Sequence, residues 1–265
     1  MARWVHLYCA PAMPNAIWQP QELKDDPHHR ADKAAKVQAM FSAIAKAYDL
    51  NNRVHSFGLD QRWRRHAVRA AAVKPTDDVL DVACGTGDLT ELFANARSRS
   101  VVGVDFTAAM LDIARVKQGR HAQYSSIRYE QGDAMALAVE SSSVDIVSIA
   151  FGLRNVSDPV QALAEFRRVL RPGGRLVVLE FDEPTNAIIR AANRLYTHHI
   201  MPWTASLLAR DRSGAYRYLP RSVETFLSRD RLRDAMLAAG FSHVEQTPLT
   251  FGTCVLSCGR VNTSA

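Results

Sequence analysis

Residues 79–88 read Val-Leu-Asp-Val-Ala-Cys-Gly-Thr-Gly-Asp, and this stretch decides the fold. An apolar run of strand composition contains Asp81, and Gly85 and Gly87 then allow a tight turn into a helix that starts at Asp88. A second apolar run ends in Asp105, where a carboxylate can accept both hydroxyls of an adenosine ribose. The two features together predict an α/β domain that binds an adenosine-containing cofactor.

The glycine turn also bears on which adenosine cofactor is bound. A dinucleotide site has a third glycine that allows close helix packing, and Thr90 stands at that place here. Unpaired N–H groups at the start of the helix suit a carboxylate, and Asp81 suits an ammonium group. S-adenosylmethionine carries both charges and a ribose, so the turn favours it over NAD. In the alternative interpretation Asp81 and Gly85 only cap a helix, but the acid at Asp105 argues against this.

Length and composition limit the class of protein. The chain has 265 residues, of which 47% are hydrophobic, and this suits one globular domain with an elaboration. It has no run of eighteen apolar residues, so we expect no membrane-spanning helix. Residues 1–32 lack the pattern of a signal peptide, and we expect them to form a poorly ordered extension.

The cysteine spacing argues against a metal site, and the net charge leaves membrane and nucleic-acid contacts open. Cys9, Cys84, Cys254 and Cys258 lack zinc-type spacing, so we expect reduced thiols in a cytoplasmic protein and no metal. The net charge is +6, and residues 190–234 contain nine arginines against four acidic residues. Three interpretations of this basic segment are open: a helical face exposed to solvent, a surface that contacts an anionic membrane, or a surface that contacts nucleic acid.

Strand and helix patterns alternate after residue 78, which predicts a doubly wound parallel sheet with helices on both faces. Two further strand patterns on either side of Gly252 predict an antiparallel hairpin at the C-terminus. With the five parallel strands they give a seven-stranded sheet that is mostly parallel. The expected strands are 79–83, 100–105, 127–131, 144–150, 175–181, 244–247 and 253–259, and the expected helices are 33–50, 60–72, 88–96, 108–117, 159–170, 185–210 with a break at Pro202, and 229–239.

Four further motifs give a resemblance to a known family. They are Tyr48-Asp49 through Trp63, Phe151-Gly152-Leu153-Arg154-Asn155-Val156, residues 168–174 followed by Leu179-Glu180-Phe181, and Tyr216-Arg217-Tyr218-Leu219 with Ser222. From about Val37 to the C-terminus the chain resembles the ubiquinone/menaquinone biosynthesis C-methyltransferases. These enzymes transfer a methyl group from S-adenosylmethionine to a ring carbon of a polyprenyl quinol. The family usually has Met, His, Ser and Ser where Asn51, Asp60, Ala150 and Asp182 stand.

The resemblance implies a Rossmann-like methyltransferase fold and a division of the domain, residues 33–265. Residues 33–75 would form an N-terminal helical lid, 76–182 the cofactor-binding core, 183–235 a helical insertion facing substrate or membrane, and 236–265 the C-terminal strands. The acceptor would be demethylmenaquinol or 2-methoxy-6-polyprenyl-1,4-benzoquinol. Another small-molecule methyltransferase, or a non-catalytic adenosine-binding partner of a biosynthetic complex, remains an alternative.

The resemblance also assigns cofactor contacts. Thr86 matches the threonine of the family's glycine loop, Asp105 its ribose-binding acid, and Asp133-Ala134 the pair at the adenine edge. With Asp81, Gly85 and Gly87 from the turn, these residues are the expected cofactor site.

Methyl transfer to a ring carbon requires a quinol hydroxyl to lose its proton. Arg154 and Asn155 follow the fourth strand at the carboxyl edge of the sheet, where ligands of such folds bind. Arg154 is a permanent cation that can stabilise a phenolate, unless it is a surface residue paired with Asp158. Tyr48 and Asp49 lie on the expected lid, and Asp49 is either the proton acceptor, directly or through water, or a polar helix end.

The tail of a polyprenyl quinol lies in the bilayer, which favours a membrane surface over nucleic acid for the basic segment. Residues 188–208 place apolar side chains beside Arg190 and Arg194, as in peripheral membrane helices, although a core-packing helix has a similar pattern. We therefore expect a cytoplasmic protein at the inner face of the membrane. The sequence has no Asn-Pro-Pro-aromatic motif for a flipped base, so we expect no nucleic-acid partner. A homodimer or a biosynthetic complex stays open.

Overall fold

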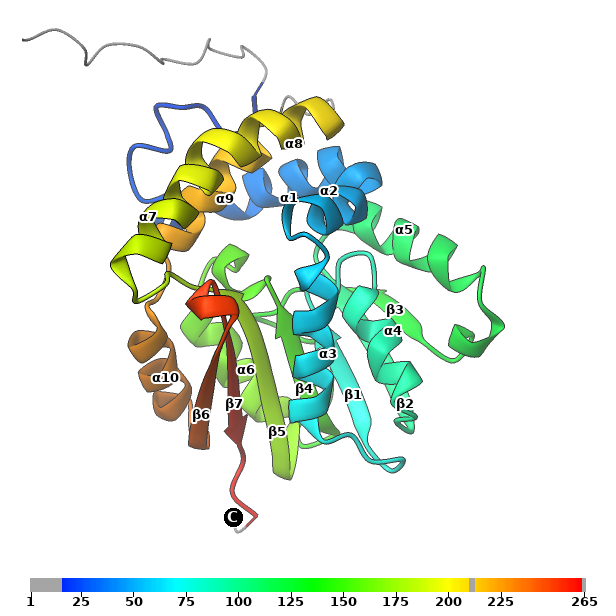
Figure 1. Cartoon of the computed structure of the whole chain (residues 1–265). Coiled ribbons are helices and arrows are strands. Elements are labelled where there is room, and N and C mark those ends of the chain that lie inside the picture. Colours follow the sequence, from blue (N-terminus) through cyan, green and yellow to red (C-terminus); the bar gives the residue numbers. More distant parts are fainter. Residues whose placement is uncertain (1–15, 210–212, 264–265) are drawn as a thin grey trace, which may run out of the picture.

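The computed structural model describes residues 16–209 and 213–263, and within them a seven-stranded sheet has the order β3-β2-β1-β4-β5-β7-β6 (Figure 1). Strands β1 to β5 pair in parallel, and β7 pairs antiparallel with both β5 and β6. This confirms the doubly wound sheet and its C-terminal hairpin. The strands are β1 (Asp78–Val82), β2 (Ser100–Asp105), β3 (Arg128–Gln131), β4 (Val144–Ala150), β5 (Leu170–Phe181), β6 (Ser242–Leu249) and β7 (Cys254–Arg260).

Two apolar layers hold helices against the faces of the sheet. On one face α3 (Leu59–Ala71), α4 (Asp88–Asn95) and α5 (Ala108–Gln118) bury their apolar residues. On the other face α6 (Pro159–Val169) and α10 (Arg229–Ala238) do the same. The central strands are covered on both sides, which explains their nearly continuous runs of Val, Ile and Leu.

A group of helices lies above the carboxyl ends of the parallel strands (Figure 1). It consists of α1 (Lys33–Ile44), α2 (Tyr48–His55), α7 (Ala187–Leu195), α8 (Met201–Ala209) and α9 (Ala215–Glu224), and we call it the cap. The helix expected over residues 33–50 is divided by a 3₁₀ turn, Ala45–Ala47. The break expected at Pro202 is a π-helical turn, Tyr196–Ile200, that joins α7 to α8, because a proline cannot donate the hydrogen bond of a regular helix.

The expectation that residues 1–32 form a poorly ordered extension is wrong for residues 16–32. Trp18 is fully buried in the cap, and its ring stacks on Tyr218 with 4.5 Å between centroids. Its backbone N–H donates to the carbonyl of Ser213 at 3.1 Å. A Trp buries a large apolar area, so this single side chain is enough to fasten the segment. Residues 1–15, including Cys9, lie outside the described residues.

Candidate functional site

The glycine turn connects β1 to α4 at the carboxyl edge of the sheet. Gly85 and Gly87 have φ of +57° and +87°, in the left-handed region that favours glycine. A Cβ on Gly87 would lie 2.3 Å from the hydroxyl oxygen of Tyr129, so a larger residue would have to displace that side chain. The backbone of the turn can therefore approach a ligand closely, as the sequence predicts.

A first cavity, of about 110 Å³, opens beside this turn. The cofactor-site residues Gly85, Asp105, Asp133 and Ala134 line it together. The Asp105 carboxylate accepts hydrogen bonds from the backbone N–H of Gly85 and of Thr107, each at 2.8 Å, and burial raises its pKa. A carboxylate has about four acceptor positions, so Asp105 keeps capacity for ligand hydroxyls.

Three other cofactor-site residues lie outside the walls of this cavity: Asp81, Thr86 and Gly87. Asp81 is 1% exposed, and its carboxylate accepts from the hydroxyls of Thr90 at 2.6 Å and Ser148 at 2.7 Å. Because this carboxylate is buried, its charge can act on a ligand only across the backbone of the glycine turn. Thr90, which replaces the third glycine of a dinucleotide site, thus serves to hold Asp81.

Burial raises the pKa of Asp81 to about 6, from an ordinary 3.8, and this has a measurable consequence. Between these values the folded protein keeps a proton that the unfolded chain has lost, so the free energy of unfolding falls as pH rises. At 1.36 kcal/mol per pH unit the loss is up to about 3 kcal/mol. We expect Asp81→Asn to remove this loss and to raise the melting temperature at pH 7. Urea unfolding of both proteins at pH 4 and pH 7 checks this; equal pH dependence in both would contradict it.

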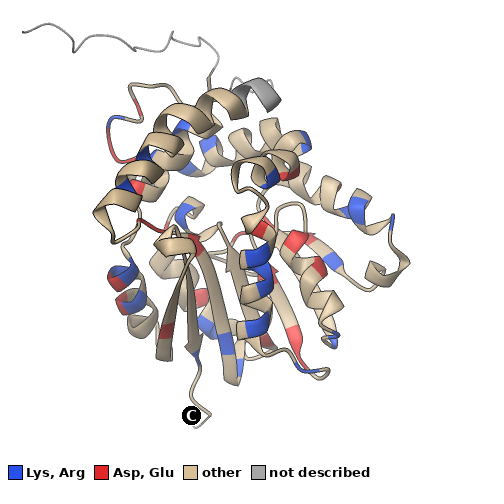
Figure 2. Cartoon of the chain, viewed as in Figure 1, with Lys and Arg blue, Asp and Glu red and all other residues tan. Residues whose placement is uncertain are grey.

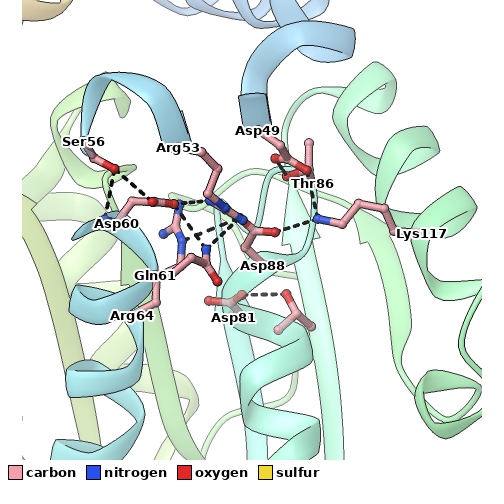
Figure 3. Close-up of polar contacts among 11 residues, drawn as sticks. Asp49, Arg53, Ser56, Asp60, Gln61, Arg64, Asp81, Thr86, Asp88 and Lys117 are labelled. Atoms are coloured by element: carbon pink, nitrogen blue, oxygen red, sulfur yellow. Dashed lines mark hydrogen bonds and ion pairs between the residues drawn. The ribbon is translucent and has the colours of Figure 1, made fainter. Parts of the chain in front are cut away.

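Asp49 and Thr86 belong to a polar cluster at the start of α4 (Figure 3). The Thr86 hydroxyl donates to Asp49 at 2.5 Å, and the Lys117 ammonium donates to Asp49 at 3.0 Å and to Asp88 at 2.6 Å. Arg53 donates to Asp88 at 2.7 Å. The cluster ties the cap to the core, and Asp49 lines neither this cavity nor the next.

A second cavity, of about 280 Å³, lies under the cap. Its walls are mainly apolar and aromatic, with Trp63, Phe181, Tyr216 and Tyr218 among them. The two cavities share four lining residues, which are Phe41, Tyr48, Phe151 and Asn155. The place where a group could pass from one bound molecule to another is therefore beside these four side chains.

Asn155 lies at this junction, and its neighbour Arg154 lines the second cavity. Arg154 is 5% exposed, and its Nη1 donates to Glu180 at 2.5 Å and to the Phe151 carbonyl at 2.6 Å. Its Nε has no hydrogen-bond partner in the described residues. Asn155 accepts from the Tyr218 hydroxyl at 3.0 Å. The alternative pairing of Arg154 with Asp158 is wrong, because Asp158 caps α6 by accepting from Val160 and Gln161.

Arg64 is a site residue that the sequence analysis missed. It is 5% exposed, lines the second cavity, and has its guanidinium carbon 5.1 Å from the centroid of the Phe151 ring. Its Nε has no hydrogen-bond partner in the described residues, and its closest acidic atom is Asp88 Oδ2, at 3.9 Å. A buried guanidinium with an unused donor suits an anionic ligand group. An Arg directly after Trp63, on the buried face of an expected helix, was the available signal.

Within residues 16–209 and 213–263 no group of His, Cys, Asp and Glu is arranged to hold a metal ion. None of the helices described there is long and apolar enough to cross a membrane.

Comparison with known proteins finds one family. The model of the ubiE/COQ5 methyltransferase family matches residues 29–260. The demethylmenaquinone methyltransferase of Deinococcus radiodurans is 47% identical over 84% of this chain and 91% of that protein. That of Thermus thermophilus is 46% identical over 83% of this chain and 99% of that protein. The ubiquinone/menaquinone biosynthesis C-methyltransferase UbiE of Hahella chejuensis is 41% identical over 86% of this chain and 92% of that protein.

Solved structures show the same fold at lower identity. An S-adenosylmethionine-dependent methyltransferase of Thermotoga maritima aligns with a TM-score of 0.57 and 20% identity over 84% of this chain and 99% of that chain. An S-adenosylmethionine-dependent methyltransferase of Aquifex aeolicus aligns with a TM-score of 0.57 and 16% identity over 82% of this chain and 97% of that chain. This likeness confirms the Rossmann-like methyltransferase architecture.

Proposed function

Because this chain belongs to the ubiE/COQ5 methyltransferase family and is a methyltransferase, we propose that it methylates a ring carbon of a polyprenyl quinol. We further propose S-adenosylmethionine as the donor and demethylmenaquinol as the acceptor, since the two relatives of 47% and 46% identity are demethylmenaquinone methyltransferases. The observation that carries the proposal is the junction of two cavities, one beside the glycine turn and one mainly apolar, at Tyr48, Phe151 and Asn155.

The residues of the first cavity suit S-adenosylmethionine. Asp105 would bind the ribose hydroxyls, and Asp133 and Ala134 would lie at the adenine edge. Arg64 lines the second cavity, with its guanidinium carbon 5.1 Å from the ring centroid of Phe151, a residue that both cavities share. Its unused Nε supports the fit, because the guanidinium would bind the methionine carboxylate where the two cavities meet. When bound, the cofactor supplies an electrophilic methyl group on a sulfonium.

The residues at the junction would orient the quinol and stabilise its anion. Arg154 cannot act as a base, but its unused Nε–H group can donate to a phenolate oxygen. Burial raises the pKa of Tyr48, so its hydroxyl stays protonated and can donate as well. Holding the acceptor carbon in line with the donor methyl can lower the barrier by roughly 7–11 kcal/mol at most.

The test in the cell is the quinone pool. A strain that lacks this gene should accumulate the demethylated quinone, and a plasmid copy of the gene should restore the methylated form. Accumulation of the benzoquinone precursor alone would move the acceptor to the ubiquinone pathway. An unchanged quinone pool would contradict the proposal.

We also propose that the cap meets the cytoplasmic face of the membrane, where the quinol tail lies. Large apolar side chains stand exposed along the cap: Ile188 is 80%, Leu195 60% and Trp203 70% exposed. In Figure 2 the described part of α8 carries no charge, while Arg190 and Arg194 belong to the neighbouring α7. The π-helical turn between them lines the second cavity through Tyr196, so this surface borders the proposed quinol site.

The double variant Ile188→Asp/Trp203→Asp tests this contact. Each apolar side chain that enters the interface contributes about 1.5 kcal/mol or more, so we expect about 100-fold weaker binding to phosphatidylglycerol vesicles. Flotation with such vesicles measures the effect. Val116→Asp, at an exposed apolar residue of α5, serves as the control and should leave vesicle binding unchanged. Equal flotation of the double variant and the wild type would contradict the contact.

A further inference from the structure

Methylation of a quinol carbon needs an acceptor for the hydroxyl proton, and Asp49, the acceptor expected from the sequence, already has two hydrogen-bond donors. Both carboxylate oxygens of Asp49 accept hydrogen bonds, from Thr86 and Lys117, and Asp49 lines neither cavity. Arg154 and the protonated Tyr48 are donors. The other residues of the second cavity are therefore the better-placed acceptors.

The acidic residues that line the second cavity already have basic partners. A hydrogen bond from a basic side chain occupies an acceptor position of the carboxylate, which leaves fewer positions for a quinol hydroxyl. These pairs are Asp60 with Arg53, Asp182 with Arg229, Glu183 with Arg194, and Glu224 with the imidazole of His198.

His55 differs from these residues. It is half-buried at the end of α2 and lines the second cavity. Its Nε2 is buried and has no hydrogen-bond partner in the described part of the chain. His55 follows Tyr48 by seven positions, which is about two helical turns. The two side chains therefore lie on one face of α2, about 10 Å apart along the axis. His55 also leans toward the start of the helix, and thus toward the junction.

Tyr196 sets which nitrogen of His55 carries the proton. The Tyr196 hydroxyl donates to the backbone carbonyl of His55 at 3.1 Å, and the same oxygen lies 3.3 Å from His55 Nδ1. Because this hydroxyl has used its proton, it can only accept from Nδ1–H. The resulting tautomer leaves a free lone pair on Nε2.

We propose that His55 Nε2 accepts the hydroxyl proton of the quinol, an assignment that rests on the proposed function. The O–H bond breaks and an N–H bond forms at Nε2, which leaves a phenolate beside Arg154 and an imidazolium held by Tyr196. Burial lowers the pKa of His55, so the imidazole is uncharged at neutral pH and ready to take the proton. After the methyl group has bonded to the ring carbon, the hydrogen on that carbon leaves as a proton and the phenolate oxygen is protonated again. The imidazolium returns its proton to water, so each turnover releases one proton.

Two substitutions of His55 test the role. We expect His55→Phe and His55→Gln each to lower kcat about 10²-fold, the lower end of what a general base contributes. Glutamine keeps a hydrogen-bond acceptor, so the KM for demethylmenaquinol should change less than threefold in His55→Gln but rise further in His55→Phe. His66→Phe is the matched control, because His66 lies on α3 and lines neither cavity.

The measurement is steady-state methylation of demethylmenaquinol in detergent micelles, beside calorimetry with S-adenosylhomocysteine. All variants should bind S-adenosylhomocysteine like the wild type, which shows that they fold. A His55→Gln variant that binds S-adenosylhomocysteine normally and turns over like the wild type would overturn the role of His55 alone. A wild-type protein that methylates no quinol would overturn the proposed function and this role together.

Discussion

Substitution of Asp105 is expected to cause the largest loss of cofactor affinity. Each hydrogen bond to a charged group contributes about 1.5–3 kcal/mol, so loss of both ribose contacts weakens binding by roughly 10²- to 10⁴-fold. Asp105→Asn should lie at the lower end of this range and Asp105→Ala at the upper end, because alanine also releases the backbone N–H of Gly85. Calorimetric titration with S-adenosylhomocysteine measures the effect.

A control separates this loss from general damage to the fold. Asp112 lies on α5, is well exposed, and pairs only with Arg115 in the described structure. Asp112→Ala should bind S-adenosylhomocysteine like the wild type. If Asp105→Ala retained an affinity within threefold of the wild type, the first cavity would not be the adenosine site.

The second large effect concerns Arg154, which we expect to be needed for turnover and not for cofactor binding. Removal of one donor to a developing oxyanion lowers kcat by about 10²- to 10³-fold. Arg154→Met alone also leaves the Glu180 carboxylate buried without its partner, and this costs about 3–5 kcal/mol of stability. A lower rate in the single variant could therefore come from lost catalysis or from lost stability.

The double variant Arg154→Met/Glu180→Gln resolves this, because it removes both charges of the pair. We expect its melting temperature to recover most of the loss, its affinity for S-adenosylhomocysteine to match the wild type, and its kcat to stay down by about 10²-fold or more. Thermal melts and quinol methylation rates check these values. Recovery of turnover together with stability would mean that Arg154 only holds the fold.

The sheet and the first cavity followed from local sequence patterns. Period and composition identify a strand or a helix, and the glycine turn and Asp105 lie within twenty-five residues of each other. Gly85 and Asp105, which local patterns identified, line one cavity together with Asp133 and Ala134, which the family resemblance supplied. Where an interaction is local in sequence, or set by the parallel order of neighbouring strands, prediction from one chain succeeds.

Side-chain partners across long separations could not be predicted in this way. The partner of Arg154 is Glu180, on the next strand, because the register of β4 and β5 brings the ends of these strands together. Trp18 packs on Tyr218 across the whole chain, so residues 16–32 were misjudged. The hydrogen bonds that Asp49 accepts from Thr86 and Lys117 likewise join distant parts of the chain. Each case depends on tertiary packing that local patterns do not encode.

Transfer of a carbon-13 methyl group tests the central claim most directly. The purified protein is incubated with S-adenosylmethionine labelled at the methyl carbon and with reduced demethylmenaquinone in micelles, and the extracted quinone is examined by mass spectrometry and carbon NMR. We predict one labelled methyl group bonded to a ring carbon of menaquinone, formed in step with S-adenosylhomocysteine. A label found on oxygen, or no label in the quinone while S-adenosylmethionine is bound, would contradict ring-carbon methylation.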